Sequence, residues 1–172
     1  MKSTLGSLVA VILMAGPLTA SALSEDRDQP MSVESDHAEL DRNTNIGTYT
    51  GNVIIVQGTF KLNADRVVVT ATGGELTHIV ANGEPAEFRQ RPDGSNEDMT
   101  GHAQQIDYYA DKSIVVLTGQ ALVQQGKDVV ESERIEYELD KDMVRAAMVE
   151  GNDARVRMIL HPKKKQPEEE VP

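Results

Sequence analysis

The chain has 172 residues, with 17 Lys and Arg against 28 Asp and Glu, which gives a formal net charge of −11. A surface this acidic repels nucleic acid and anionic lipid headgroups, which argues against a DNA-binding role. Because there is no Cys, disulfides and thiolate metal sites are excluded, and packing and strand pairing must stabilise the fold.

The N-terminal segment 1–22 has the pattern of a secretory signal peptide. Lys2 gives a positive start, the segment 5–18 is apolar, and "ASA" at 20–22 is a small-residue cleavage site. A membrane anchor is the alternative interpretation, but the apolar run is too short to span a bilayer, and Pro17 lies near its end. We therefore expect cleavage after Ala22 and an exported chain.

Both ends of the remaining chain are rich in charge. We expect 23–30 to be a flexible lead-in and 161–172 to be a disordered charged tail, since the tail holds three consecutive Lys, three consecutive Glu and three Pro. One domain should then occupy 31–160, a size that suits a single hydrophobic core.

Inside this domain the periodicity is that of β-strands. Three segments, 86–91, 134–139 and 155–160, alternate apolar and charged residues. The segment 143–150 could form a helical turn, but its β neighbours favour a strand. Turn signals fall at 42–45, 73–74, 82–85 ("NGEP"), 92–96 and 151–153. Turns at this regular, short spacing predict an all-β sandwich or jelly roll of short strands.

The apolar face of these strands should form the interior. Its predicted members are Met31, Val33, Ile55, Val67, Val69, Phe88, Ile106, Tyr108, Leu117, Ile135, Tyr137, Leu139, Val156 and Met158. Such residues usually form a core only. An acyl chain could also enter between the two sheets, since burial contributes about 0.8 kcal/mol per methylene.

The two halves of the domain share a pattern. When the chain is aligned with itself so that Thr50 falls on Thr118, identity also holds at Gly51, Gln57, Gly58, Arg66, Gly83 and Ala86. The last two fall on Gly151 and Ala154, and the pair His37–Ala38 recurs at 102–103 with a shorter shift. We interpret this as a repeated strand–turn–strand module, with chance similarity of Val- and Gly-rich strands as the alternative. An open meander of this kind leaves edge strands that can pair with another chain.

Catalytic and metal-binding patterns are absent from the sequence. The chain has no Gly-x-Ser-x-Gly motif, and its four His residues do not stand at metal-ligand spacing. Carboxylates are abundant, but abundance alone does not define an acid–base pair. We expect no enzyme activity, no catalytic residues, no metal and no cofactor.

Three segments together resemble the LptA family of periplasmic lipopolysaccharide-transport proteins, which carry the OstA-like domain. They are "DQPMSVESDHAELD" at 28–41, "YTGNVIIVQGTFKLNADRVVVT" at 49–70 and "GHAQQIDYYADKSIVVLTGQALVQQG" at 101–126. The resemblance covers nearly all of 31–160. It implies an open β-jelly roll of two facing antiparallel sheets with a V-shaped section. It also implies a periplasmic role in carrying lipopolysaccharide from the inner to the outer membrane.

The resemblance implies partners and sites as well. The acyl chains of lipid A should lie in an apolar groove, in which Met31, Val33 and Phe88 match interior positions of the family. The inward-facing residues of the predicted strands add Ile55, Val67, Val69, Ile135 and Tyr137 to its lining. Further copies of the chain, an LptC-like inner-membrane protein and an LptD-like outer-membrane protein should pair with its edges, formed by Met31, Ser32, Val33, Glu34, Val156, Met158 and Leu160.

The sequence is also compatible with two other functions. The protein could be a structural adaptor that joins envelope proteins by strand addition without lipid contact. It could also be a periplasmic glycan-processing enzyme, which would need a pair of carboxylates in a cleft.

Overall fold

The computed structural model describes residues 26, 29–92, 95–141, 143–148 and 155–162. The predicted signal peptide, most of the predicted tail, and the repeat positions Gly151 and Ala154 lie outside these ranges. Within them, no helix is long and apolar enough to cross a membrane.

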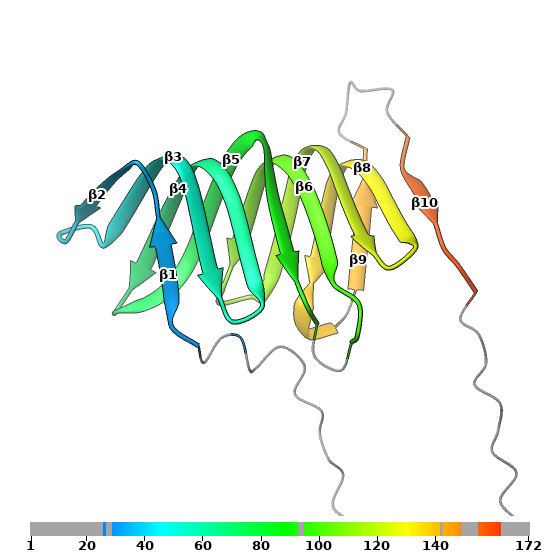
Figure 1. Ribbon diagram of the computed structural model, residues 1–172, viewed down its shortest axis with the longest axis horizontal. Coiled ribbons are helices and arrows are strands. Elements are labelled where there is room, and N and C mark those ends of the chain that lie inside the picture. Colours follow the sequence, from blue (N-terminus) through cyan, green and yellow to red (C-terminus); the bar gives the residue numbers. More distant parts are fainter. Residues whose placement is uncertain (1–25, 27–28, 93–94, 142, 149–154, 163–172) are drawn as a thin grey trace, which may run out of the picture.

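The described chain is almost entirely antiparallel β-strand, which confirms the predicted all-β class (Figure 1). A single ten-stranded sheet has the order β1-β3-β4-β5-β6-β7-β8-β10, with β2 beside β3 and β9 beside β8. The predicted strand within 143–150 is present as β9. The elements are β1 (Met31–Glu34), β2 (His37–Asp41), β3 (Ile46–Gln57), β4 (Phe60–Thr72), β5 (Glu75–Gln90), β6 (Met99–Tyr109), β7 (Ile114–Gln125), β8 (Asp128–Glu138), the 3-10 helix η1 (Leu139–Lys141), β9 (Met143–Ala147) and β10 (Arg157–Ile159).

A row of β-bulges folds this one sheet into two facing layers. The register breaks in the middle of every central strand pair, between Thr50 and Val53 in β3, for example, and between Thr118 and Ala121 in β7. Bulges bend the strand that carries them, and Figure 1 shows the strands turning over along one long side of the molecule. We call this row of bulges the spine.

The spine divides each long strand into two shorter halves. Layer A contains β2, β9 and the halves 46–50, 66–72, 75–82, 105–109, 114–118 and 134–138. Layer B contains β1, β10 and the halves 53–57, 60–63, 86–90, 99–102, 121–125 and 128–132. The two layers diverge from the spine, which gives the open, V-shaped jelly roll that the family resemblance implies.

The repeated "TG" dipeptide marks the corner of β3 and of β7. Gly51 has a φ of 78° and Gly119 a φ of 84°, and the residue after each also has a positive φ. A Cβ atom on Gly51 would overlap Asp36, and one on Gly119 would lie 2.9 Å from the Cβ atom of Gln104. Both corners therefore require glycine, which explains why the sequence contains the same short motif twice.

The prediction of a turn at 82–85 is wrong. This "NGEP" segment lies inside β5, which runs without a turn for 16 residues, and it forms the spine bulge of that strand, with a cis bond between Glu84 and Pro85. Residues in a bulge have no ladder partner, so a strand tolerates Gly and Pro there. The strands are consequently long and bent.

Strand register confirms the internal repeat. Met31 pairs with Gln57, and Met99 pairs with Gln125, so β1 and β2 together correspond to β6, β3 to β7 and β4 to β8. The predicted equivalence of His37 with position 102 is wrong. His37 pairs with Thr50 in layer A, whereas residue 102 lies in layer B, and the partner of Thr118 is Gln105.

The core lies on the inner faces of both layers. Its largest fully buried side chains are Ile55, Leu117, Ile135, Val53 and Val67. Alternation in 86–91 and 134–138 matches the burial pattern, with apolar residues inward and charged residues outward.

The prediction that Val156 and Met158 are interior residues is wrong. They are 37% and 48% exposed, respectively. The reason is that β10 is the last strand of the sheet, and no described element packs over it.

Candidate functional site

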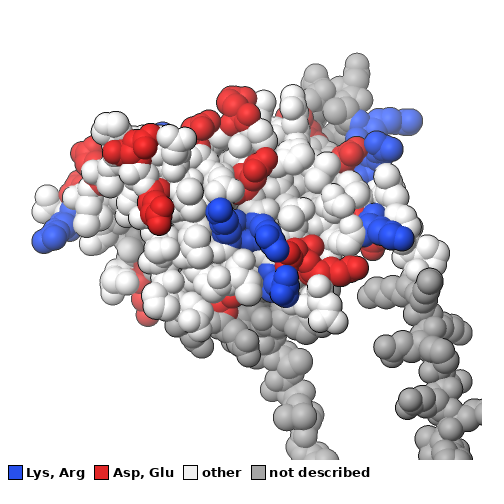
Figure 2. All heavy atoms as spheres, viewed as in Figure 1, with Lys and Arg blue, Asp and Glu red and all other residues white. Residues whose placement is uncertain are grey.

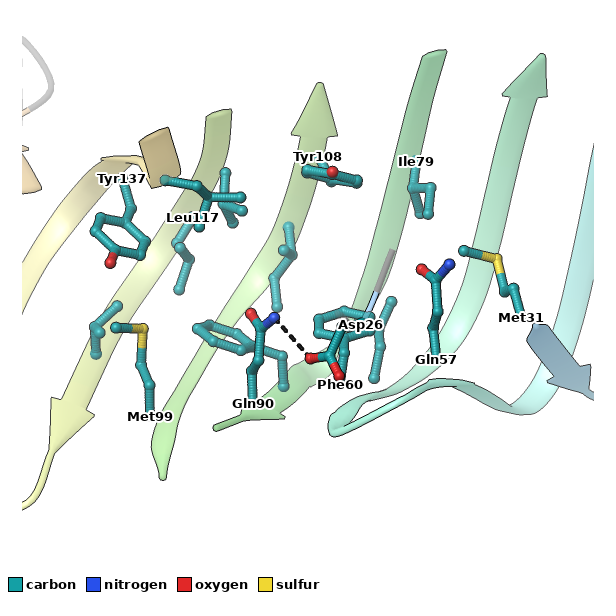
Figure 3. Close-up of a pocket in the computed structure, with 16 residues that line it drawn as sticks. Asp26, Met31, Gln57, Phe60, Ile79, Gln90, Met99, Tyr108, Leu117 and Tyr137 are labelled. Atoms are coloured by element: carbon teal, nitrogen blue, oxygen red, sulfur yellow. Dashed lines mark hydrogen bonds between the residues drawn. The ribbon is translucent and has the colours of Figure 1, made fainter. Parts of the chain in front are cut away.

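An apolar groove runs between the two layers on the side away from the spine (Figure 3). Layer A and layer B each contribute one wall, because alternate residues of every strand half point toward the other layer. The wall residues are Met31, Phe60, Leu62, Ile79, Phe88, Met99, Ile106, Tyr108, Val115, Leu117, Val123, Tyr137 and Leu139.

The groove is narrow. The free space between its walls is about 80 Å³, whereas pockets for small ligands usually measure about 300–1,000 Å³. Phe60 and Phe88 of layer B and Tyr108 of layer A fill part of the space. A long apolar ligand can enter only if these side chains move or the layers separate.

Phe88 is positioned by a glycine on the neighbouring strand. It pairs with Gly101 of β6, and a Cβ atom on Gly101 would overlap the Phe88 ring. The ring therefore lies close to the β6 backbone at Gly101, and it also lines the groove. Any side chain at position 101 would push the ring toward the opposite wall.

Polar groups lie on the open rim of the groove. Asp26 accepts hydrogen bonds from the backbone N–H of Thr59 (2.6 Å), the Thr59 hydroxyl (2.7 Å) and the Gln90 side-chain amide (3.1 Å). Burial raises the pKa of Asp26, but these hydrogen bonds together lower it below its usual value. The Gln57 amide donates to the backbone carbonyl of Gln29. These bonds attach the segment before β1 to the rim (Figure 3).

The structure brings three of the eight predicted groove residues to the groove surface, namely Met31, Phe88 and Tyr137. Three others, Ile55, Val67 and Ile135, have 0% exposure and belong to the packed core. The remaining two, Val33 and Val69, are partly buried against that core.

Sequence reasoning missed several groove residues. Met99 occupies the place of Met31 in the second repeat, so the repeat itself could have identified it. Phe60 closes the hairpin between β3 and β4, where no alternation shows which way the ring points. Asp26 and Gln90 gave no signal, because their contact joins residues 64 positions apart in the sequence.

The predicted joining edges lie at opposite ends of the sheet (Figure 1). The first edge consists of β1 and β2, and among the described strands both pair only with β3. The second consists of β9 and β10, which in the same part of the chain pair only with β8. Most of the large exposed apolar side chains of the described residues lie at these two ends: Leu40, Val144, Met148, Val156, Met158, Ile159 and Leu160 are each 36–69% exposed, and Val56 of β3 is the exception.

A polar network on the outer face of layer A contains an Asp–His pair. Asp107 is 8% exposed and lies 3.1 Å from the Nε2 atom of His78, and Gln105 donates to its other oxygen at 2.7 Å. The His78 ring stacks on Tyr109 with centroids 4.4 Å apart. Because Asp107 holds His78 against its own sheet and none of these residues lines the groove, we assign the network a structural role.

A second depression follows the spine and contains carboxylates, as an enzyme cleft would. Asp65, Glu84 and Glu133 line it, but the first two are exposed and the third is half-buried. A glycosidase needs one acid in a buried site, and none of these three side chains is buried. Among the described residues, no group of three or more His, Cys, Asp or Glu is placed to hold a metal ion.

Charges on the outer face of layer B form local clusters. Figure 2 shows acidic and basic groups close together on a surface that is mostly uncharged. In one cluster, Asp98 accepts hydrogen bonds from Arg91 (2.8 Å) and Arg89 (2.7 Å), which hold the pKa of Asp98 below its usual value. These arginines are already paired with a carboxylate.

The bent sheet that forms the groove matches a known protein family over most of its strands. The family model described as LptA/(LptD N-terminal domain) LPS transport protein matches residues 32–143. The chain belongs to this LptA/LptD N-terminal-domain family. The match spans the sheet from β1 to the start of β9, so both walls of the groove except Met31 lie within the family's domain.

Individual members of the family match along most of their length. The chain is 40% identical over 163 residues to the lipopolysaccharide export system protein LptA of Escherichia coli K12, covering 94% of this chain and 86% of that protein. It is 31% identical over 169 residues to LptH of Pseudomonas aeruginosa, covering 95% and 97%. The crystal structure of LptH, described as the LptA-homologous periplasmic component of the lipopolysaccharide transport device, superposes with a TM-score of 0.74 at 29% identity, covering 80% of this chain and 99% of that chain.

Proposed function

We propose that this protein binds lipopolysaccharide in the periplasm and carries it from the inner to the outer membrane as part of a protein bridge. The observation that carries the proposal is the apolar groove, whose walls extend from β1 at one end of the sheet to β8 near the other. Relatives that match this chain along most of their length are named for lipopolysaccharide export. The role is one of binding and transport, without covalent chemistry.

The acyl chains of lipid A supply the binding energy in this proposal. Each methylene that leaves water for the groove contributes about 0.8 kcal/mol, and the walls offer aliphatic, aromatic and thioether side chains that adapt to a chain's shape. A phosphate-bearing headgroup gains less, because the protein carries a formal charge of −11 and Asp26 lies on the open rim. The headgroup therefore stays in solvent outside the rim.

Binding requires the narrow groove to widen. The bends between the layers lie in bulges, where ladder hydrogen bonds are already interrupted. The layers can therefore separate by small changes at each bulge while the ladders within each layer persist. The contacts of Asp26 with Thr59 and Gln90 lie on the rim that a chain must cross.

The bridge forms through the two edges in this proposal. No other described strand pairs with the outer sides of the edge of β1 and β2 or the edge of β9 and β10, and such edges pair with added strands. A second copy, an LptC-like protein at the inner membrane or an LptD-like protein at the outer membrane would each continue the groove by strand addition. The ends Met31–Glu34 and 156–160 take part in these contacts.

A photocrosslinking experiment tests the lipid contact. A photoreactive amino acid at Phe88, which lines the groove, should capture lipopolysaccharide in living Gram-negative cells. The matched control is Glu87, the adjacent residue on the same strand, which faces outward and is exposed. A lipid adduct at position 88 and none at 87 is the expected result. Equal adducts at both positions, or none at groove positions, would contradict the proposal.

The narrowness of the groove favours a second candidate, the structural adaptor that never contacts lipid. The two functions differ in how they respond to Phe88→Asp, a change within the groove and away from both edges. A transport bridge should lose lipopolysaccharide delivery, whereas an adaptor should keep its role as long as the variant folds. Circular dichroism of the purified variant establishes folding, and the outer-membrane lipopolysaccharide content of complemented cells gives the outcome.

A further inference from the structure

The internal repeat contains a strand junction that the two ends of the molecule lack. In the repeat, β6 corresponds to β1 and β2. Among the strands that the structure describes, β6 has a neighbour on each side, whereas β1 and β2 pair only with β3. The additional neighbour of β6 is β5. The protein thus shows, within one chain, what a strand lying against the outer side of β1 and β2 looks like.

The opposite end supplies the strands that correspond to β5. In layer B, Phe88 of β5 pairs with Leu62, and Met158 of β10 pairs with Val130, which is the repeat equivalent of Leu62. Met158 therefore occupies the place of Phe88. In layer A, β9 pairs with β8 as β5 pairs with β4, and the position of Ala146 corresponds in the same way to that of Ala81.

We propose that the β5–β6 junction is the template for the contact between two copies of this chain and fixes its register. The inference rests on the head-to-tail assembly proposed above and adds the residue pairs. Transfer of the β5–β6 register to the repeat-equivalent positions places β10 of one copy on β1 of the next through the pairs 157–34, 158–33 and 159–32. It places β9 on β2 through the pairs 147–37, 146–38, 145–39, 144–40 and 143–41.

The pairs in layer B are chemically complementary. Arg157 faces Glu34 of the next copy on the outer side, and Met158 faces Val33 on the groove side. Arg157 already lies 3.3 Å from Glu131, so it would stand between two carboxylates. Within the chain, the residue at the place of Val33 is a glycine that accommodates Phe88. The unbranched Met158 at the contact suits the larger Val33.

The pairs in layer A repeat this arrangement. Arg145 faces Glu39 of the next copy on the outer side and already contacts Glu136 of its own β8. On the groove side, Val144 faces Leu40, and these two side chains are 36% and 63% exposed in the single chain. The contact would cover both apolar side chains and would continue the inner face of layer A from one copy into the next.

Other registers lose these matches. A slip by one residue turns the inward apolar side chains of one edge against the outward charged side chains of the other. A slip by two residues keeps the faces but moves Arg157 from Glu34 to Ser32 or to the end of the strand. Each exposed ion pair contributes only about 0.2–1 kcal/mol, so the apolar pairs supply the affinity and the charges select the register.

Cysteine crosslinking tests the register directly, because the chain has no Cys of its own. Two single variants of the purified full chain, Glu34→Cys and Arg157→Cys, are mixed under mild oxidation. Directly opposed residues on antiparallel strands have Cα atoms about 4.5–5.5 Å apart, which lies within the range that a disulfide spans. The matched control replaces Ser32 in place of Glu34, two residues away on the same outer face. A second mixture, Glu39→Cys with Arg145→Cys, reports on layer A.

The expected result is a mixed disulfide dimer in both test mixtures, forming roughly tenfold faster than in the control, because an offset of two residues separates the Cα atoms beyond reach. Faster linking of the Ser32 control would overturn the register and leave head-to-tail assembly intact. Two results would overturn the assembly itself. One is disulfide dimers that join only two copies of the same variant, and the other is a rate of disulfide formation that does not rise with protein concentration. Sedimentation of the unmodified protein at the same concentrations shows separately whether copies associate, whatever partner pairs with the edges in cells.

Discussion

Replacement of Gly119 by Ala tests whether the spine depends on close approach at its corners. Gly119 has a φ of 84°, and a Cβ atom there would lie 2.9 Å from the Cβ atom of Gln104. Gly73 provides a matched control, because its φ is 65° but nothing lies within 4 Å of the position that its Cβ atom would take. The two substitutions share the backbone cost and differ in the steric cost.

The magnitudes follow from these two terms. An L-residue in the left-handed region costs about 1–2 kcal/mol, and the lower entropy of the unfolded Ala chain returns about 0.4–1 kcal/mol. Gly73→Ala should therefore lower the free energy of unfolding by about 0–1.6 kcal/mol. Gly119→Ala adds an overpacking cost of about 1–3 kcal/mol. This cost is unavoidable because the opposing atom is a Cβ, which moves only with its strand.

Urea denaturation followed by circular dichroism measures both losses, since the unfolding free energy is linear in denaturant concentration. Gly51→Ala should behave like Gly119→Ala, because Gly51 occupies the same corner in the first repeat. Equal losses for Gly119→Ala and Gly73→Ala would refute the reasoning, since the corner would then tolerate a side chain.

Three further outcomes are expected. The lowered pKa of Asp26 means that its contribution to stability is complete above the ordinary value of 3.8 and is lost as the pH falls through the lower folded-state value. Asp26→Asn should therefore reduce the difference between the melting temperatures at about pH 6 and at about pH 2. An unchanged difference would count against the rim contact. Asp107→Ala leaves His78 without its partner and should lower the unfolding free energy by about 1–3 kcal/mol, which urea titration measures; groove binding of lipid should not change. Met158→Pro and Ile159→Pro each remove one backbone N–H from β10, and alternate N–H groups of an edge strand point outward, toward an added strand. Only the variant that removes an outward N–H should therefore abolish concentration-dependent association in sedimentation. If neither variant does, the joining edge lies elsewhere.

Side-chain alternation predicted the faces of the central strands correctly. In 86–91 and 134–138, neighbours on both sides hold each strand, so a local period of two is enough to assign inward and outward residues. The same reasoning failed at Val156 and Met158, because inward orientation buries a side chain only where another layer covers it. Their exposure depends on the position of β10 at the end of the sheet, which periodicity does not encode.

The bend of the strands was not predictable from local signals. "NGEP" at 82–85 has the composition of a turn, and only the continued pairing of β5 with both neighbours keeps the chain extended there. Only some of the groove-wall residues were predicted, because alternation does not distinguish the core from the groove. Residues such as Ile55 and Phe88 have the same apolar pattern, yet one is buried in the core and the other faces the groove, since the angle at the spine decides how far the layers diverge.

The repeat has a consequence for how molecules of this kind can vary in size. One unit consists of four strand positions: β1 and β2 together, then β3, β4 and β5 in the first unit, and β6, β7, β8, and β9 with β10 in the second. The last position of one unit pairs with the first position of the next. Lengthening such a protein needs no new fold and no new kind of contact, because one inserted unit would find the same neighbours that the present units have. The length of a single chain then depends on the number of units. In the assembly proposed above, the boundary between two chains would interrupt the backbone but not the sheet.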